Sequence, residues 1–466
     1  MSGTFMGINI ALSSLQAQQA ALDTVANNIA NANTPGYKRQ RVLLGEGNPV
    51  TGPFGDGINR RTMLGTGVDV IEIQRVQDTF VDNRVRQTSA SASEWAAKSD
   101  TLAQLESIFN EPSDQGIGSQ LDKFWSAWEK LSAQPDDIPT RKALIQQAQT
   151  LTMRIRQSYG QIRSIGEDVD TAVRDKVGQI NSITSQIVEL NRKIQWSSSS
   201  GASPNDLLDQ RDILVGQLSS LAGVDVFGKG GQDFTVILGN KILVQGTARD
   251  TLGVRLDAGG LQEVYSTADG DARRVPGGEI AGLLDLRANA IPGFMTALDD
   301  FASALAVEVN AIHNTGFTMD GTQAGDFFDP NTTAADFEVD PDILSSARNV
   351  AASDAALPPG NNVISNQIAG LRTQTLAVGR TINQLYQGII SDAGTQSALA
   401  KQYADTQNAT LEQFTAQQQS VSGVSLDEEM TDMIRFQQAY GAAARILTAC
   451  DDVLSTLIEK TGMVGR

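Results

Sequence analysis

The sequence predicts a mainly α-helical chain that carries a smaller β-rich domain, and three observations support this fold class. At both ends of the chain, apolar residues recur every seven positions, which indicates terminal helices that form a coiled-coil-like inner unit. Over residues 162–194, apolar residues follow one another at steps of three or four, which is typical of a long helix in an elongated helical domain. Residues 223–277 instead hold short apolar runs separated by Gly and Asp, which favours an inserted β domain.

The first predicted helix starts near the N-terminus and ends near Asn33, where Pro35 and Gly36 favour a turn. Residues 1–37 contain a single charged side chain, Asp23, although a solvent-facing helix usually carries Lys or Glu. We therefore expect this helix to contact protein on several faces. Its predicted assembly seam consists of Ile8, Leu12, Leu15, Leu22 and Ile29.

The last predicted helix starts after Ser425, because Ser425 and Glu428 have the spacing of a capping box. Its predicted assembly seam also has a seven-residue period and consists of Met433, Tyr440, Leu447 and Leu454. A second apolar stripe lies beside this seam, so the helix has more apolar surface than one partner covers. We expect both terminal helices to become fully ordered only when neighbouring copies cover their remaining faces.

The interior is predicted to contain long antiparallel helices. The 162–194 helix should extend about 50 Å and turn back through a loop of small residues. Asn205 is expected to cap the returning helix, which should reach about Leu221. A second helical pair is expected at about 363–390 and 393–420.

The β-rich part is predicted from a hairpin signal, Gly239-Asn240, between two apolar runs. The expected strands cover residues 234–238, 241–244, 252–256 and 263–266. The Gly-rich string 228–231 lacks the spacing of a phosphate-binding loop and is interpreted as a turn. A further helix should run from Gly278 toward Asn314.

These elements suggest three units. The terminal inner unit consists of residues 1–50 and 421–466. The elongated helical domain consists of residues 51–222 and 361–420, together with the helix at 278–315. The β-rich inserted domain consists of residues 223–277, and residues 316–360 are a candidate addition to it.

Composition limits the classes of partner and chemistry. The 466 residues have a net charge of −18, so we expect neither nucleic acid nor a membrane surface as a partner. No window offers about 20 uninterrupted apolar residues, so no membrane span is expected. The single histidine, His313, and the single cysteine, Cys450, leave no multi-histidine or multi-cysteine metal motif, and both are expected to be packed. We expect no catalytic residue, no metal and no cofactor, and hence no enzyme.

Three strings carry a resemblance to a known family. The first resembles the N-terminal signature shared by flagellar rod, hook and hook-associated subunits, in residues Asn27, Asn28, Asn31, Asn33, Thr34, Pro35, Gly36 and Tyr37. Residues 37–40 and 422–430 look more like hook-associated protein 1 than like rod or hook subunits. Residues 205–212 are similar to a string typical of the same family. From their chemistry, Asn27, Asn28 and Asn31 either bond neighbouring backbones or are hydrated at the surface.

The resemblance implies a structural subunit that assembles at the distal end of the hook as the first junction zone between hook and filament, and that filament attachment and motility require. The implied partners are copies of the chain itself, the hook protein, the second junction protein (hook-associated protein 3), an export chaperone and the type III export apparatus. The implied location is extracellular, in the flagellum. Because the first lysine is Lys38 and no basic leader precedes an apolar core, export should not depend on a cleaved secretory signal.

Two alternatives remain open. One is a hook or distal-rod subunit of the same axial family, which the N-terminal string favours and the C-terminal string disfavours. The other, from a different class, is a peptidoglycan hydrolase associated with the flagellum.

Overall fold

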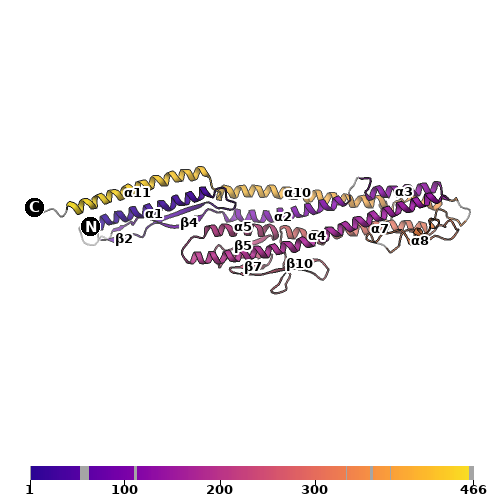
Figure 1. Ribbon diagram of the computed structural model, residues 1–466, viewed down its shortest axis with the longest axis horizontal. Helices are drawn as coiled ribbons and strands as arrows, with labels where there is room; N and C mark the ends of the chain where they lie inside the picture. Colours follow the sequence, from indigo (N-terminus) through magenta and orange to yellow (C-terminus); the bar gives the residue numbers. More distant parts are fainter. Residues whose placement is uncertain are drawn as a thin grey trace.

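The computed structural model describes residues 2–52, 62–109, 113–331, 333–356, 360–377 and 379–460. The molecule is elongated, with both termini at the same end (Figure 1). Two terminal helices, α1 (Ser2–Ala30) and α11 (Leu426–Lys460), project together beyond a longer helical body. The predicted fold class is therefore confirmed: helices dominate, and small antiparallel sheets accompany them.

The terminal unit combines the two helices with a β hairpin. Strand β1 (Gln40–Glu46) pairs antiparallel with β4 (Val68–Arg75), from Gln40 opposite Arg75 to Glu46 opposite Val68. The short strands β2 (Val50–Gly52) and β3 (Thr62–Leu64) continue the hairpin. The hairpin runs beside α1, so residue 50, the predicted boundary of the terminal unit, lies within it. Helix α1 ends at Ala30, slightly earlier than the predicted end at Asn33.

Long helices form the body. These are α2 (Thr79–Phe109), α3 (Ile117–Ala133), α4 (Ile138–Ser199), α5 (Asn205–Ala222) and α10 (Ile382–Ser422). Helices α4 and α5 form the predicted antiparallel hairpin, although α4 starts well before residue 162. Helix α10 packs along α2 and leads through a short break at 423–425 into α11 (Figure 1).

The run from Gly278 is also helical, as predicted, but it includes one wider turn. It consists of α6 (Gly278–Asp285), the π-helical turn η1 (Leu286–Ala290) and α7 (Ile291–His313). The backbone N–H of Ile291 bonds to Leu286 O, and the next residue, Pro292, has no N–H to offer. The wide turn accommodates the proline, and the helical run continues through it into α7.

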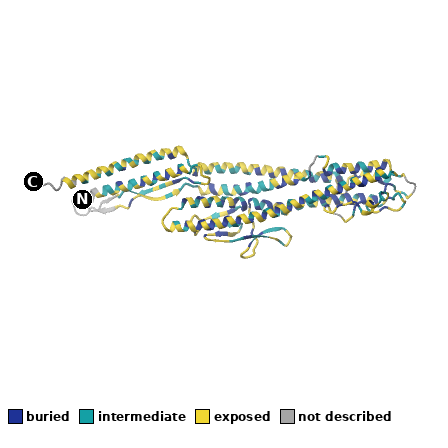
Figure 2. Cartoon of the chain, in the orientation of Figure 1, coloured by how far each residue is buried: buried dark blue, intermediate teal, exposed yellow. Residues whose placement is uncertain are grey.

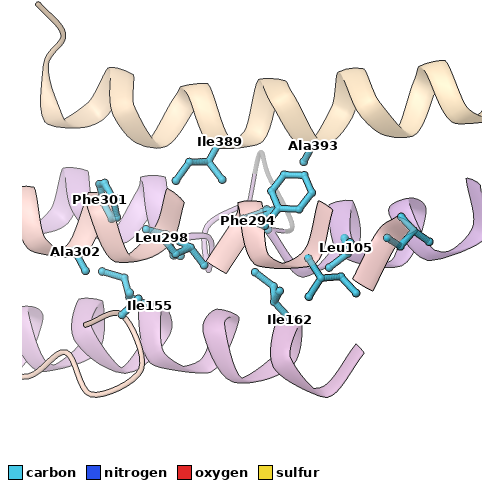
Figure 3. Packing of buried hydrophobic residues seen from close by; sticks show 14 of the residues in the cluster. Leu105, Ile155, Ile162, Phe294, Leu298, Phe301, Ala302, Ile389 and Ala393 are labelled. Carbon is cyan, nitrogen blue, oxygen red and sulfur yellow. The ribbon is translucent and has the colours of Figure 1, made fainter. Parts of the chain in front are cut away.

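The core of the body lies between α2, α4, α7 and α10. Figure 3 shows Leu105, Ile162, Phe294, Leu298 and Ile389 directed toward one another from these helices. Burial of such side chains stabilises the fold by about 1.5–3 kcal/mol each. The body is thus held by large apolar residues at helical spacing.

An aromatic cluster fills the end of the body far from the termini. It consists of Phe124, Trp125 and Trp128 of α3 with Phe327, Phe328 and Phe337. Residues 316–356 wrap this end with isolated β-bridges, α8 (Pro341–Ser345) and the 3₁₀ turn η2 (Ala347–Asn349). They pack beside the 141–156 part of α4, where Arg141 donates to Val350 O and Arg156 pairs with Glu338. The predicted addition of 316–360 to the β-rich domain is therefore wrong for the described part, because aromatic burial places it here.

The β insertion lies against the later part of α4. Strands β5 (Val224–Phe227), β6 (Thr235–Leu238), β7 (Lys241–Gln245) and β8 (Ala248–Arg249) form one antiparallel sheet, and β9 (Leu252–Leu256) pairs with β10 (Gln262–Ser266). The predicted hairpin at Gly239-Asn240 and all four predicted strands are present. The 228–231 turn is held by Arg211, which donates to Lys229 O at 2.8 Å and to Gly230 O at 2.9 Å.

Two expectations are wrong. The second helical pair does not form, because α9 (Val363–Gly370) is short and α10 continues unbroken through 390–393 from a capping box at Thr381 and Gln384. Asn205 does not cap α5; its amide Nδ2 donates to Ile73 O at 2.7 Å instead. One segment, Gly278–His313, meets the length and hydropathy criteria for a membrane span, but its core-facing side chains such as Phe294 and Leu298 are buried in the body.

Candidate assembly interface and the joint behind it

The two terminal helices contact each other through small residues. Ala11, Ala17 and Ala21 of α1 are at most 2% exposed, and Ala443 of α11 is 4% exposed. A Cβ atom at Gly7 would lie only 3.2 Å from Cys450 Sγ, which shows how closely the two backbones approach. The pair is therefore closed mainly by alanine and glycine together with Val25, and most of its larger apolar side chains lie at the margins of the contact.

The predicted seam residues lie at these margins. Leu12 and Tyr440 are exposed, with 45% and 39% of their surface accessible. The other seven are partly buried: Ile8, Leu15, Leu22, Ile29, Met433, Leu447 and Leu454. Both seams therefore lie in the same terminal unit, but the contact between α1 and α11 buries them only in part.

Further apolar side chains on α11 face solvent, on more than one side of the helix. They are Leu426, Met430, Ile434, Ile446, Val453 and Ile458, each between 51% and 75% exposed. Figure 2 shows exposed positions along the whole of α11, in contrast to the dark interior of the body. Exposed apolar surface of this extent is typical of an interaction site.

Asn28 holds the base of the helix pair. It is 1% exposed, and its Nδ2 donates to Gln40 O at 2.8 Å and to Glu429 Oε2 at 2.9 Å. Its Oδ1 accepts from the Gln40 N–H and the Tyr37 O–H, both at 2.9 Å. Both donors and both lone pairs of the amide are therefore used. One side chain ties the end of α1 to β1 and to α11.

Arg39 joins the same point to the start of α11. It forms ion pairs with Glu428 and Glu429 at 2.6 Å each and with Asp432 at 3.6 Å. Burial opposes the charge on Arg39, but Glu429 and Glu428 outweigh it and raise the pKa of the guanidinium. The backbone N–H of Arg39 also donates to Ser422 O, so the break between α10 and α11 is fixed from both sides.

A buried ion network connects this point to the body. Lys38 Nζ lies 2.8 Å from Asp82 Oδ2 of α2 and 3.2 Å from Asp212 Oδ2 of α5. Arg75 Nη1 lies 2.7 Å from Asp209 Oδ1 and 3.0 Å from Asp212 Oδ2. We call this region the joint: residues 28, 37–40, 75, 82, 205–212 and 428–432.

The pKa values of the joint follow from burial and charge. Burial raises the pKa of Asp209, although Arg75 opposes the rise. Burial also disfavours the charged form of Asp212, but Lys38 and Arg75 outweigh it and lower its pKa. For Tyr37, burial first and then the carboxylates of Asp206 and Asp209 raise the pKa. We infer that the Lys38–Asp82 and Arg75–Asp209 ion pairs, whose side chains are at most 10% exposed, hold the joint together.

The family-motif residues separate into two groups. Asn28 and Tyr37 are part of the joint, and Asn31 bonds to Asn27 within the last turn of α1. The others are exposed: Asn27, Asn33, Thr34, Pro35 and Gly36. Gly36 has φ +78°, and a Cβ there would press on the Ile213 side chain, so the turn requires glycine.

Sequence reasoning missed the function of the 205–212 string. Besides Asp209 and Asp212, Asn205 bonds to Gln40 Oε1 at 3.1 Å, and Asp206 accepts from Gln40 Nε2 at 3.3 Å. One feature of the sequence could have suggested these contacts: three strings resemble the same family and are rich in polar residues. They cover residues 28–40, 205–212 and 422–432. These are the strings that meet at the joint.

Comparison with known proteins agrees with this arrangement. The family model described as "Flagellar hook-associated protein FlgK helical domain" matches residues 102–328. "Flagella basal body rod protein" matches residues 8–38, and "Flagellar basal body rod FlgEFG protein C-terminal" matches residues 417–460. Flagellar hook-associated protein 1 of Bacillus subtilis (strain 168) is 29% identical over the whole length of both chains. The chain belongs to the flagellar hook-associated protein 1 family.

Other similarities support this membership. Flagellar hook-associated protein 1 of Escherichia coli (strain K12) is 27% identical over 97% of this chain and 99% of its own length. The solved flagellar hook junction protein FlgK from Burkholderia pseudomallei has the same fold, with a TM-score of 0.65 and 18% identity over 73% of this chain and all of that one. The family is one of structural flagellar proteins, and the rod-type matches at 8–38 and 417–460 coincide with the terminal unit and the joint.

Proposed function

We propose that the chain is a structural subunit of the hook–filament junction, which assembles with copies of itself at the distal end of the hook and attaches the filament. The observation that carries this proposal is the terminal helix pair, which projects from the body with its predicted seams only partly buried and with exposed apolar side chains on several sides of α11. Neighbouring copies in a tube can cover these faces through heterologous contacts. The seam residues named above are the proposed contacts.

The joint supports the same mechanism. The projecting helices α1 and α11 can transmit force to the helical body only if the end that joins them to the body is rigidly held. Here Asn28, Arg39 and the Lys38–Asp82 pair fix that end to α11, β1 and the body. We infer that force acting on the assembled helices passes through the joint into α2 and α5. The three-unit division, with a terminal unit, an elongated helical domain and a β insertion, is part of this proposal.

The finer partners are proposed on the same basis. They are the hook protein on one side, the second junction protein on the other, and an export chaperone with the type III apparatus before assembly. The extracellular location in the flagellum belongs to the same proposal. Each partner can be tested by pull-down of the purified chain with the purified candidate protein.

Deletion of the gene in its own bacterium tests the junction against the hook or distal-rod alternative. A junction subunit predicts complete hooks, no filaments and flagellin shed into the medium. Loss of the hook itself would instead indicate a rod or hook subunit. The match of residues 102–328 to a hook-associated helical domain supports the junction.

The hydrolase alternative has a separate test. Asp299 is one candidate acid outside the joint, because burial and neighbouring Asp300 raise its pKa, although the hydrogen bond from the Ala334 N–H opposes the rise. We propose that the chain is not an enzyme, so purified protein should release no soluble fragments from peptidoglycan. Release that disappears with Asp299→Asn and persists with Asp122→Asn would contradict the structural function.

A further inference from the structure

A groove of about 560 Å³ lies on the body, outside the terminal unit. It is lined by residues of α2, η1, α7 and α10, with Trp95 and Tyr403 stacked at a ring-centroid distance of 4.5 Å along one wall. The π-helical turn η1 contributes Leu286 and Asn289 to its lining. Such turns are frequent at functional sites. Leu399 and Tyr403 at its edge are 48% and 49% exposed.

Lys98, the cation among the described residues that line this groove, is paired within the chain. Lys98 Nζ lies 2.9 Å from both Glu94 Oε1 and Asp285 Oδ2 and stands 4.6 Å from the centre of the Trp95 ring. Burial opposes the charge on Lys98, but Asp285 and Glu94 outweigh it and raise its pKa. An incoming ion would have to compete with these pairs. The exposed part of the groove is therefore suited to an apolar or aromatic side chain.

Helix α10, which forms one wall of the groove, is unusually poor in charge. Among its 41 residues the charged side chains are Asp392, Lys401, Asp405 and Glu412. Its exposed positions are otherwise filled mainly by Gln, Asn, Ser, Thr and Ala. Copies of a chain with a net charge of −18 repel one another, so close contact is favoured where charge is sparse. Helix α10 meets this condition.

The groove lies on the helix that leads into the candidate assembly interface. Helices α10 and α11 follow each other along one side of the molecule (Figure 1). Leu399 and Tyr403 on α10 are exposed, Val421 near the end of α10 is 40% exposed, and exposed apolar side chains follow on α11 from Leu426 onward. The same line of helices thus presents apolar side chains from the terminal unit to the groove.

We propose that the Trp95–Tyr403 groove is a docking site for a second copy of this chain, so that the assembly surface extends from α11 onto the body. This inference rests on the proposed self-assembly and assigns a specific site to it. The neighbour inserts an apolar side chain beside Trp95 and covers Leu399 and Tyr403. Through this contact, the body and the terminal helices of one copy would both bind the neighbouring copy.

Two measurements test this proposal. The first uses tryptophan fluorescence in a Trp196→Phe background, because Trp196 is 77% exposed whereas Trp125 and Trp128 are fully buried. Trp95 is then the reporter of the groove. Acrylamide quenching of this signal should fall at least threefold when the protein assembles on isolated hooks. Unchanged quenching on assembly would overturn the proposal, and so would protection by an added export chaperone in place of assembly.

The second measurement uses Leu399→Glu, with Leu256→Glu as a matched control on strand β9, where Leu256 is 63% exposed. The groove variant should bind hooks at least tenfold more weakly, whereas the control should bind as the wild type does. Equal binding by both variants would contradict the groove site. Failure of the wild type itself to bind hooks would contradict the proposed function instead. If circular dichroism shows Leu399→Glu to be misfolded, the quenching measurement on intact protein remains decisive.

Discussion

The helical body and the terminal helix pair are both built from long helices, yet they bury different side chains. The body encloses Phe124, Trp125 and Trp128 with no exposed surface. The terminal pair encloses Ala11, Ala17 and Ala21, while its Leu, Met and Ile side chains remain partly or largely exposed. Because stabilisation by burial scales with apolar area, the body can be stable alone, whereas the pair gains most from neighbours.

This difference separates two kinds of mutational effect. A change in the body should alter the free energy of unfolding of the single molecule. A change in the terminal seams should leave that free energy nearly unchanged and act on assembly. The joint lies between the body and the terminal helix pair. A change there should alter how firmly the helix pair is held to the body.

The largest expected effect is loss of assembly in Leu447→Asp or Leu15→Asp. A carboxylate at a seam that neighbouring copies bury would have to be desolvated, which is strongly unfavourable. We expect no filament attachment, with unfolding of the body unchanged to within about 0.5 kcal/mol. Filament counts and denaturant unfolding followed by tryptophan fluorescence measure the two effects. Leu344→Asp, at an exposed site of the body, is the control, and normal filaments in a seam variant would contradict the interface.

In the body, Trp128→Ala should lower the free energy of unfolding by about 3–5 kcal/mol, since it opens a cavity beside Phe327 and His313. Urea titration of the monomer measures this change. The control is Trp196→Ala, whose side chain is 77% exposed and should contribute less than about 0.5 kcal/mol. Equal effects of the two substitutions would show that the far end of the body is not the stable core inferred here.

His313 gives the body a dependence on pH. Its Nδ1–H donates to Gly325 O at 2.7 Å and its Nε2 accepts from the Ala351 N–H at 2.8 Å, so the buried ring is neutral. Burial lowers the pKa of His313 from 6.5 to about 4, although Gly325 and Asp326 oppose the shift and Arg141 adds to it. The resulting stabilisation, about 3 kcal/mol, is present above pH 6.5 and is lost as the pH falls toward 4.

Two measurements check this behaviour. Because the sequence has one histidine, the NMR titration of a labelled imidazole reports its pKa directly. The loss of stability between pH 6.5 and pH 4 should be smaller in His313→Gln, whose amide can still donate to Gly325 and accept from Ala351. An imidazole that titrates near 6.5 in the folded protein would contradict the buried neutral ring.

Local and periodic features could be predicted from the sequence. Heptad spacing located α1 and α11, steps of three and four located α4, and Gly239-Asn240 located the β6–β7 hairpin. Each depends on residues close together in the chain. The unbroken α10 was missed. Gly394 and the neighbouring Ser and Thr residues have low helix propensity, but packing along α2 overrides it.

The joint could not be predicted, because its contacts join distant positions. Asn28 and Glu429 are 401 residues apart, and Lys38 and Asp82 are 44 apart. An asparagine on a helix gives no local sign that all its hydrogen bonds are long-range. The sequence therefore located the seam positions, but the way in which the joint fixes them to the body required the three-dimensional structure.

Asn28→Asp tests whether the joint couples the two regions. The substitution preserves shape, removes the donors to Gln40 O and Glu429 Oε2, and places a carboxylate against the buried Glu429. We expect local opening of the α1–α11 base to become easier by about 1.5–3 kcal/mol, the range for a hydrogen bond to a charged group. Hydrogen exchange of the terminal helices in the monomer measures this opening, and exchange in α2, α4 and α7 should not change.

Asn27→Asp is the matched control, because it puts the same charge at the same end of α1 at an exposed position. Any effect of the helix dipole, about 0.3–1 kcal/mol, is common to both substitutions. The excess effect of Asn28→Asp should decrease at low pH, since a shared proton relieves the repulsion between the two carboxylates. Equal exchange in both variants would show that Asn28 does not hold the base of the helix pair. The terminal unit would then be held to the body by the Lys38 and Arg75 ion pairs and by the hydrogen bonds of Gln40 and Asn205.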